Sequence, residues 1–341
     1  MNQSNCNITI LVTGGAGFIG SHLTDKLLAS GYHVTVLDNL SNGNFDNLKE
    51  ARAFPRFKFI HGDILSVSDC DEASAGVDFI FHLACLGVRN SIHSPFENHR
   101  VNAEGTLNIL HAARKERVKH FFYISTSEIY GRTSSFPITE LAATNPLTVY
   151  GASKLAGEHY TNAYHECYGL PTTVLRIFNN YGPRAHYEGD AGEIIPRSIV
   201  KILYDEAPVL FGNGNISRDF FFVKDTAKAL QLLLEIAQSE NRGKLRAKTF
   251  NIGTGTELSM KDLLETILKK MDRIELGINF MADRPADVPR LWVLADEFRK
   301  LTAFKPSYAF DDGLQETIDY YAKKVTQQHI LKEVQEINWI K

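Results

Sequence analysis

A tyrosine and a lysine stand in the run Tyr150-Gly-Ala-Ser-Lys154, at the spacing that places two side chains on one face of a helix. An ammonium group beside a phenol favours the phenolate and lowers its pKa, so Tyr150 could exchange a proton with a substrate hydroxyl during hydride transfer. The spacing alone is not specific. The chain carries it again in Tyr320 and Lys324, where we expect a solvated helix face without a catalytic role.

Hydroxyl groups and one carboxylate lie together in the run Ser125–Gly131, which precedes Tyr150 in the chain. We expect this run at the end of a strand, and ligands bind at the carboxyl edge of a parallel sheet. Thr126, Ser127 and Glu128 are therefore candidate catalytic residues beside Tyr150. The same residue types also cap helices and form turns, which is the alternative interpretation of this run.

A glycine-rich turn follows the first apolar run, with the sequence Thr13-Gly-Gly-Ala-Gly-Phe-Ile-Gly20. In such a turn, between a strand and a helix, one glycine permits the tight bend and another lets the backbone approach a pyrophosphate. A third lets helix and strand pack closely. The N–H groups and the dipole at the start of the helix favour an anion there. We expect a dinucleotide to contact Gly14, Gly17, Phe18, Ile19 and Gly20.

An acidic residue, Asp38, closes the next strand pattern, Val34–Asp38. A carboxylate there can accept hydrogen bonds from a ribose diol and would repel a 2′-phosphate, and no arginine follows it directly, so we predict NAD rather than NADP. Asp63 ends a further strand pattern and could touch the adenine, although a turn-capping aspartate is an alternative. The other expected cofactor contacts near these strand ends are Asn39, Ile64, Leu83 and Ala84.

Short apolar runs alternate with helical patterns over the first part of the chain, which is typical of a doubly wound parallel sheet, an α/β Rossmann fold. Helices are expected around Ser21–Ser30, Ala103–Glu116 and Tyr150–Tyr168. The expected strands are Ile8–Val12, Val34–Asp38, Lys58–Ile60, Phe79–His82, His120–Ser125 and Pro171–Phe178.

The alternation of strand and helix patterns ends at Tyr181–Gly192. This stretch is dense in glycine, proline and charged residues, which predicts a long functional loop. We therefore expect an NAD-binding Rossmann domain over 1–180, with returns near 219–228 and 249–256. A smaller mixed lobe over 181–218 and 257–341 would bind the substrate. Its predicted helices lie around Ile194–Tyr204, Thr226–Gln238 and Met260–Lys270.

The composition excludes several classes of protein. The 341 residues carry 37 Lys+Arg against 40 Asp+Glu, a net charge of -3, which gives no global attraction for nucleic acid or an anionic membrane. No apolar run is long enough to span a bilayer, and no basic signal region opens the sequence. The scattered cysteines Cys6, Cys70, Cys85 and Cys167 indicate reduced thiols in a cytoplasmic protein, and we expect neither a metal site nor a disulfide framework.

Together these motifs resemble the extended short-chain dehydrogenase/reductase family, and specifically its NAD-dependent nucleotide-sugar epimerases and dehydratases. The resemblance covers nearly the whole chain. Besides the residues above, it includes His82-Leu-Ala-Cys85, Arg176-Ile-Phe-Asn-Asn-Tyr-Gly-Pro-Arg184, Arg218-Asp-Phe-Phe-Phe-Val, Asn251-Ile-Gly-Thr-Gly and Arg284-Pro-Ala-Asp-Val, in the family's order.

The resemblance implies a bound NAD that oxidises C4 of a nucleotide-linked hexose and later returns the hydride. Thr126 and Tyr150 would handle the proton of the C4 hydroxyl, and Lys154 would bind the nicotinamide ribose while acidifying Tyr150. Asn179 or Asn180, Arg218 and Arg284 match positions that hold the pyrophosphate and nucleoside; for a single arginine the alternative is a surface ion pair. By analogy we also expect a homodimer, paired through the helices that begin near Ala103 and Tyr150.

Glu128 bears on which reaction follows the 4-ketone. A 4,6-dehydratase needs a base at C5, whereas a 4-epimerase needs only proton exchange at O4. In the resemblance, glutamate here marks dehydratases and glucuronate decarboxylases, while Ser127 departs from the aspartate common in deoxyhexose-forming dehydratases. Glu193 stands where the decarboxylases carry arginine and would repel a sugar carboxylate.

We therefore favour a 4,6-dehydratase. The alternatives, in order, are a 4-epimerase acting on UDP-hexose or UDP-glucuronate and then a UDP-glucuronate decarboxylase. An alternative of another class is a non-catalytic NAD-binding sensor, against which the intact Thr126, Tyr150 and Lys154 argue.

Overall fold

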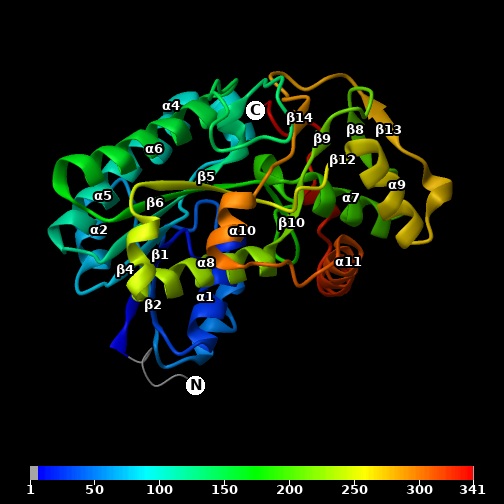
Figure 1. The fold of residues 1–341 in the computed structure, drawn as a ribbon. Coiled ribbons are helices and arrows are strands. Elements are labelled where there is room, and N and C mark those ends of the chain that lie inside the picture. Colours follow the sequence, from blue (N-terminus) through cyan, green and yellow to red (C-terminus); the bar gives the residue numbers. More distant parts are fainter. Residues whose placement is uncertain (1–6, 341) are drawn as a thin grey trace.

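A seven-stranded parallel sheet in the order β11-β6-β5-β4-β1-β2-β3 forms the centre of the molecule (Figure 1). The computed structural model describes residues 7–340, so Cys6 lies outside the described residues. Because β1 pairs with both β2 and β4, the strand order reverses there, which places the topological switch point at the carboxyl end of β1. The strands are β1 (Thr9–Thr13), β2 (His33–Asp38), β3 (Phe57–His61), β4 (Phe79–His82), β5 (His120–Thr126), β6 (Thr172–Ile177) and β11 (Lys248–Ile252).

One face of the sheet is covered by α1 (Phe18–Ala29) and α8 (Val223–Gln238), which pack against each other below the sheet in Figure 1. Leucines recur at helical spacing on both helices and, except for the partly buried Leu232, they are fully buried in one cluster with Val12 and Val36 of the strands. α10 (Asp296–Thr302) packs against the same layer beside β11. The leucine stripes are the reason these segments fold as helices against the sheet.

The other face carries α2 (Val67–Ser74), α5 (Gly105–Lys115) and α6 (Val149–Tyr168). Gly157 lets α6 approach the sheet closely, because a Cβ there would lie 2.5 Å from Cζ of Tyr123 on β5. The Tyr123 hydroxyl in turn donates to the carbonyl of Lys154, at 3.1 Å. These contacts fix the helix that carries Tyr150 and Lys154 directly above β5.

A buried polar network ties α6 to the carboxyl ends of the strands. Arg176 of β6 pairs with Glu158 of α6 at 2.7 Å, and Ser125 of β5 donates to the same carboxylate at 2.5 Å. Arg176 also donates to the Tyr130 hydroxyl at 2.8 Å, which donates to Oδ1 of Asn251 on β11 at 2.7 Å. Buried charges need such partners. The landmarks around Arg176 and Asn251 therefore hold the edge of the sheet on which the candidate residues lie.

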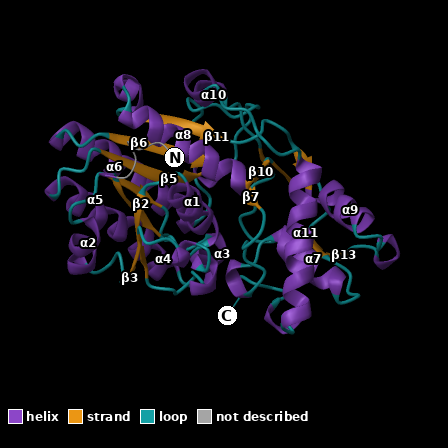
Figure 2. Cartoon of the chain, turned by 90° about the horizontal axis from the view of Figure 1, so that it is seen from below, coloured by secondary structure: helices purple, strands orange, loops and turns teal. Residues whose placement is uncertain are grey.

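A second lobe stands beside the carboxyl edge of the sheet and contains α7 (Ile194–Leu203), α9 (Met260–Lys270) and α11 (Phe310–Gln327), seen together in Figure 2. Its core is separate from those of the sheet and includes Ile199, Leu264 and Ile318. The lobe and the segments that join it to the sheet contain short strands: β7 (Asn179–Tyr181), β8 (Val209–Phe211), β9 (Ser217–Arg218), β10 (Phe220–Phe222), β12 (Leu258–Ser259), β13 (Asn279–Met281) and β14 (Arg290–Leu291).

Asp219, between β9 and β10, joins the lobe to the sheet. Its buried carboxylate accepts hydrogen bonds from the backbone N–H groups of Thr254 at 2.9 Å and Gly255 at 2.7 Å, just after β11. The sequence landmarks around Arg218 and Asn251 thus contact each other. They set the position of Arg218 relative to the sheet.

The predicted fold class is confirmed: a doubly wound parallel sheet with helices on both faces. The predicted strands and helices agree with the structure to within a few residues; α1 starts at Phe18 rather than near Ser21, because Gly17 is its N-cap. The short α2 and the two- and three-residue strands were not predicted. No helix among residues 7–340 is long and apolar enough to cross a membrane.

Candidate active site

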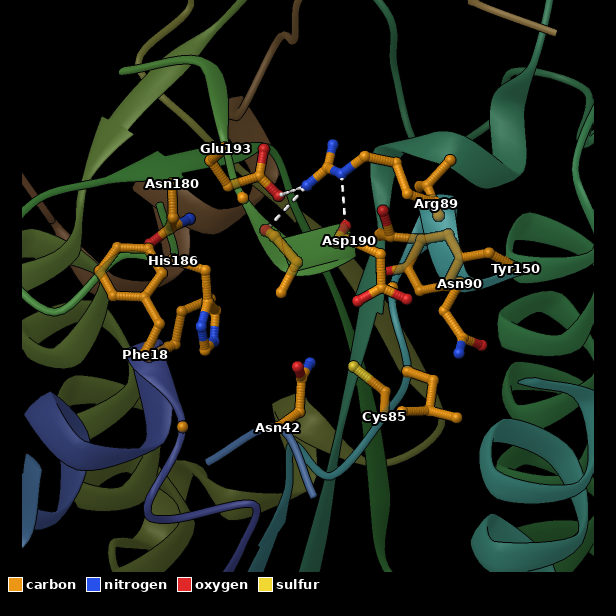
Figure 3. Close-up of a pocket in the computed structure, with 18 of the residues that line it drawn as sticks. Phe18, Asn42, Cys85, Arg89, Asn90, Tyr150, Asn180, His186, Asp190 and Glu193 are labelled. Atoms are coloured by element: carbon orange, nitrogen blue, oxygen red, sulfur yellow. Dashed lines mark hydrogen bonds and ion pairs between the residues drawn. The ribbon is translucent and has the colours of Figure 1, made fainter. Parts of the chain in front are cut away.

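One cavity of about 630 Å³ runs along the carboxyl edge of the sheet and continues under the second lobe. Every residue that the sequence predicted for cofactor binding, catalysis or substrate binding lines it. In Figure 3, Phe18 and His186 lie on one side of this cavity and Tyr150 and Cys85 on the other. Its volume lies within the usual range of small-molecule and cofactor sites.

The glycine-rich turn wraps the start of α1 at one end of the cavity. Gly14 has a φ of 68°, and a Cβ there would lie 2.7 Å from the backbone nitrogen of Ala84. A Cβ on Gly20 would lie 2.8 Å from Cα of Gly15. Gly17 caps α1 without any side chain, so the first N–H groups of the helix remain open to an anion. This cradle fits the pyrophosphate of a dinucleotide.

Two carboxylates stand beside this cradle. Asp38 is buried and accepts hydrogen bonds from the backbone N–H groups of Ala16 and Leu40, each at 2.9 Å, while it lines the cavity. Burial raises its pKa, and these bonds partly offset the effect. Asp63 accepts from Leu65 N at 2.8 Å and from the Asn39 amide at 3.0 Å, so it closes a turn and also faces the cavity.

The hydroxyl of Tyr150 lies close to that of Thr126, at the end of β5. Burial raises the pKa of Tyr150 above its usual range, and the nearby thiol of Cys85 adds to this, while a hydrogen bond with Thr126 opposes it. The acidification of Tyr150 by Lys154 stays a prediction, because the net shift of the Tyr150 pKa is upward and burial is its largest cause. The Lys154 ammonium lies 4.4 Å from the ring centre of Tyr123, and burial lowers its own pKa.

Ser127 and Glu128 begin the short 3₁₀ turn Ser127–Tyr130 that follows β5. The Thr126 hydroxyl caps this turn by accepting a hydrogen bond from Glu128 N at 3.2 Å. Thr126 therefore has the capping role of the alternative interpretation and also lines the cavity. Burial raises the pKa of the Glu128 carboxyl, and the guanidinium groups of Arg218 and Arg284 partly offset that shift. Glu128 therefore sits between the tyrosine and the arginines.

The arginines at the far end of the cavity share one carboxylate. Arg218 and Arg284 approach Oδ1 of Asp287 at 3.0 and 2.7 Å. Arg218 also donates to two backbone carbonyls, which fixes its side chain. Asn180 donates from its side-chain Nδ2 to Phe178 O, and its Oδ1 accepts from the Thr226 hydroxyl. Oδ1 of Asn179, in contrast, has no protein partner. Of these two asparagines, Asn179 is thus the one left free to hydrogen-bond a ligand.

The cavity also contains charged residues that the predicted site did not include. Arg89, at the start of α3 (Val88–His93), donates from Nε to Asp190 O at 2.7 Å and from Nη2 to Ala191 O at 2.9 Å and Glu193 Oε1 at 2.7 Å (Figure 3). Although burial opposes it, Arg89 holds the pKa of Glu193 below its usual range. Arg89 lies in α3, separated from the end of β4 by the segment 83–87, so no local signal of a strand end identifies it.

Known proteins that are similar to this chain belong to the class that the geometry of the site indicates. The sequence profile of the family described as GDP-mannose 4,6 dehydratase matches residues 11–317. A dTDP-glucose 4,6-dehydratase from Streptomyces niveus is 35% identical over 320 residues, covering 92% of this chain and 92% of that protein. A UDP-glucose 4-epimerase from Mycolicibacterium smegmatis is 33% identical over 320 residues, covering 92% of this chain and 98% of that protein.

Among solved structures, the dTDP-glucose 4,6-dehydratase DesIV from Streptomyces venezuelae, with NAD bound, is similar with a TM-score of 0.88 at 32% identity, covering 95% of this chain and all of that one. The match thus spans both the sheet and the second lobe. The chain therefore belongs, as its motifs predicted, to the nucleotide-sugar epimerases and dehydratases of the extended short-chain dehydrogenase/reductase family.

Proposed function

We propose that this protein is an NAD-dependent nucleotide-sugar 4,6-dehydratase. The observation that carries the proposal is Glu128, a carboxyl group on the wall of the same cavity as Tyr150 and Thr126. A dehydratase needs such a group to take the proton from C5, and a 4-epimerase does not. Dehydratases and epimerases are equally similar to this chain in sequence and in structure, so Glu128 and not the similarity carries this choice.

The residues present fit NAD. The open start of α1 and the glycine cradle would hold its pyrophosphate. Asp38 would accept hydrogen bonds from the adenosine ribose, and no arginine directly follows it in the sequence to favour a 2′-phosphate. Lys154, buried beside Tyr150 on α6, would bind the nicotinamide ribose. When bound, NAD accepts a hydride from C4 of the sugar and later returns it to the same sugar.

Tyr150 and Thr126 act at the C4 oxygen. Tyr150 takes the hydroxyl proton as the ketone forms, and Thr126 hydrogen-bonds to the same phenol and stabilises its ionised form. The raised pKa of Tyr150 without cofactor means that the phenolate must be stabilised when the site is filled. The positive charges of Lys154 and of the oxidised nicotinamide would supply that stabilisation.

Glu128 acts next, at C5. The 4-ketone acidifies the C5 proton, which Glu128 takes, and the electron pair left at C5 expels the C6 hydroxyl, which leaves as water after gaining a proton. The stored hydride would then return to C6, while Glu128, after exchange with solvent, gives a proton back to C5. Ser127, which is 3% exposed and lines the cavity, or a water beside it supplies that proton. A raised pKa makes Glu128 a stronger base once it is ionised, as the reaction requires.

A 4-epimerase is the second candidate. Epimerases match this chain as well as dehydratases do, at 36% and 35% identity, and Ser127 is not the acid that dehydratases commonly carry. Decarboxylation of a uronate is less well supported, although Glu193 does not repel a carboxylate as strongly as its sequence position indicates, because Arg89 pairs with it. That pairing also leaves no free cation at this position to bind a uronate.

Glu128→Gln separates these reactions when the protein is tested in heavy water with its nucleotide sugar. For a dehydratase we expect the variant to keep C4 oxidation, seen as transient absorbance of reduced cofactor. It should lose product formation and deuterium incorporation at C5. For an epimerase the variant would still turn over within about tenfold of the wild-type rate, which amounts to about 1.4 kcal/mol of barrier.

For the assembled enzyme, the proposal includes a homodimer paired through α5 and α6, by analogy with the family. Both helices lie on one face of the sheet, away from the cavity-lining lobe. Sedimentation at micromolar concentration tests it: a dimer is expected, and a protein that remains entirely monomeric would contradict it.

A further inference from the structure

The segment Ile330–Ile340, which we call the strap, crosses the second lobe and reaches the cavity from outside. It begins at Ile330, which is buried in the core of the lobe and donates its N–H to the Tyr204 hydroxyl at 3.2 Å. In Figure 1 the red end of the ribbon lies between the sheet and the lobe. None of its residues lines the cavity, so any effect on the ligand must pass through the residues that it touches.

The strap holds the loop between β7 and α7. Glu333 accepts a hydrogen bond from the Tyr187 hydroxyl at 2.8 Å. The amide of Asn338, which is 1% exposed, donates to Gly192 O at 3.1 Å and Gly189 O at 3.3 Å. These bonds clamp the ends of the stretch 189–192 from outside the cavity, while Arg89 holds its carbonyls from within. Most of this stretch is cavity wall.

The strap also holds Arg197, a cavity-lining residue on α7. Its Nη2 donates to the backbone carbonyls of Gln335 and of Glu336, the latter at 3.0 Å. Its Nε is buried without a protein partner. Burial lowers the pKa of Arg197 to about 10, and the positive charges of Arg89 and Arg284 add to that effect. A guanidinium in this position, next to two others, suits a diphosphate more than a neutral group.

A third contact lies at the end of the cavity remote from Tyr150. The indole of Trp339, which is 8% exposed, packs edge-on against the ring of Phe211, with 4.6 Å between ring centres and an angle of 77°. Phe211 ends β8, and all three residues of β8 line the cavity. Such an aromatic pair contributes about 0.5–1.5 kcal/mol beyond its buried area and fixes ring orientation. Trp339 therefore sets the position of this wall.

These contacts converge on one region of the cavity, the part formed by α7, β8 and the 189–192 stretch. We infer that Asn338 and Trp339 are positioning residues for the nucleoside diphosphate portion of the substrate, which they affect through Arg197, Phe211 and the loop without touching it. The inference rests on the proposed function, because it assumes a nucleotide-linked substrate. It adds that residues of the strap, outside the cavity, set the affinity for that nucleotide.

Binding of UDP, dTDP, CDP and GDP to the NAD-loaded protein, measured by calorimetry, tests the inference without requiring any particular reaction. We expect Trp339→Ala and Asn338→Ala each to lower the affinity for the nucleotide that the wild-type protein binds by about tenfold. Trp339→Phe should restore most of the affinity, since an aromatic ring still meets Phe211. Ile337→Ala is the matched control, because Ile337 lies in the strap but is 40% exposed.

Activity provides a second readout. Trp339→Ala should raise KM for the nucleotide sugar by about tenfold, while kcat and the content of bound NAD stay within about twofold of wild type. Wild-type affinity in both alanine variants would overturn the inference, as would a Trp339→Ala variant that loses NAD and thermal stability along with nucleotide and is not rescued by Trp339→Phe. A wild-type protein that binds none of the four nucleotides would instead contradict the proposed function.

Discussion

Tyr150 and Lys154 on α6 have a counterpart in Tyr320 and Lys324 on α11, with the same residue types at the same spacing on a helix. From the sequence we expected the second pair to lie on a solvated helix face. In the structure it packs against other side chains instead. Tyr320 packs against Tyr321 with ring centres 5.0 Å apart, and Lys324 lies 4.6 Å from the ring centre of Tyr187. Burial raises the pKa of Tyr320 and lowers that of Lys324.

The two pairs thus share spacing and the direction of their pKa shifts, although Lys154 is buried more completely than Lys324. They differ in what surrounds them. Tyr150 and Lys154 line the cavity at the carboxyl edge of the sheet, beside Thr126 and Glu128, whereas Tyr320 and Lys324 line no part of it. The Tyr-x-x-x-Lys spacing therefore becomes a candidate site only where a strand end supplies hydroxyls and a carboxylate next to it.

Replacing the two phenols gives the largest expected difference. Tyr150→Phe should lower kcat by about 10³-fold, in the range of general acid–base catalysis, while NAD and nucleotide binding stay near wild type. Tyr320→Phe should leave kcat within about twofold. Steady-state kinetics of both variants measures this, and equal losses would mean that the wrong tyrosine has been chosen.

Replacing the two lysines should separate the pairs less strongly. Lys154→Met removes the group that would orient the nicotinamide ribose, so we expect kcat to fall by about 10²-fold together with weaker retention of NAD. Lys324→Met removes only a contact with the ring of Tyr187 and should change stability by about 1 kcal/mol or less, with normal activity. NAD content after denaturation and thermal unfolding distinguish the two. A Lys154→Met protein with full activity would contradict the expected difference between the two lysines.

Asp38→Asn tests the other end of the cavity. The amide can still occupy the turn, but it no longer presents a charge to the ribose, so we expect NAD affinity to fall by about tenfold and NADP affinity to rise. Equilibrium binding of both cofactors to protein freed of NAD measures the change. Tighter binding of NADP than NAD by the wild-type protein would contradict the assignment of Asp38.

The smallest expected effect is a shift in a pH profile. Because burial raises the pKa of Glu128, a base at this position loses its function as pH falls through a value higher than that of an ordinary glutamate. The acid limb of kcat should therefore begin above the pH range in which a solvent-exposed carboxyl group titrates, and kcat should fall by about tenfold per pH unit below it. An acid limb at the pH of an ordinary, solvent-exposed glutamate would contradict the assignment of Glu128 as this base.

The class of the sheet, most of its strands and the residues along its edge could be predicted because strands and their ends leave local signals. Apolar runs identify β1, β2, β4 and β5, and their last residues identify Asp38 and Thr126. Arg89 and Arg197 could not be assigned in this way. Their roles depend on the 189–192 loop and the strap, which meet them only in the folded chain.

The electrostatics of the candidate site also could not be predicted from the sequence. Spacing predicts that Lys154 lies near Tyr150, but it does not show that burial outweighs the ammonium charge or that Tyr123 lies under that ammonium. The pairing of Glu193 with Arg89 likewise changes the charge that the loop presents to a sugar. Such effects depend on depth in the molecule, which only the packing of the sheet, helices and lobe defines.

The mass of the product tests the central claim most directly. NAD-loaded protein is incubated with a panel of UDP-, dTDP-, CDP- and GDP-hexoses in heavy water, and the nucleotide sugars are then analysed by mass spectrometry. A dehydratase that uses Glu128 at C5 converts one of them to a product that has lost one water and gained one deuterium at C5. A turned-over sugar of unchanged elemental composition, with altered retention and no deuterium, would contradict the dehydratase and identify an epimerase.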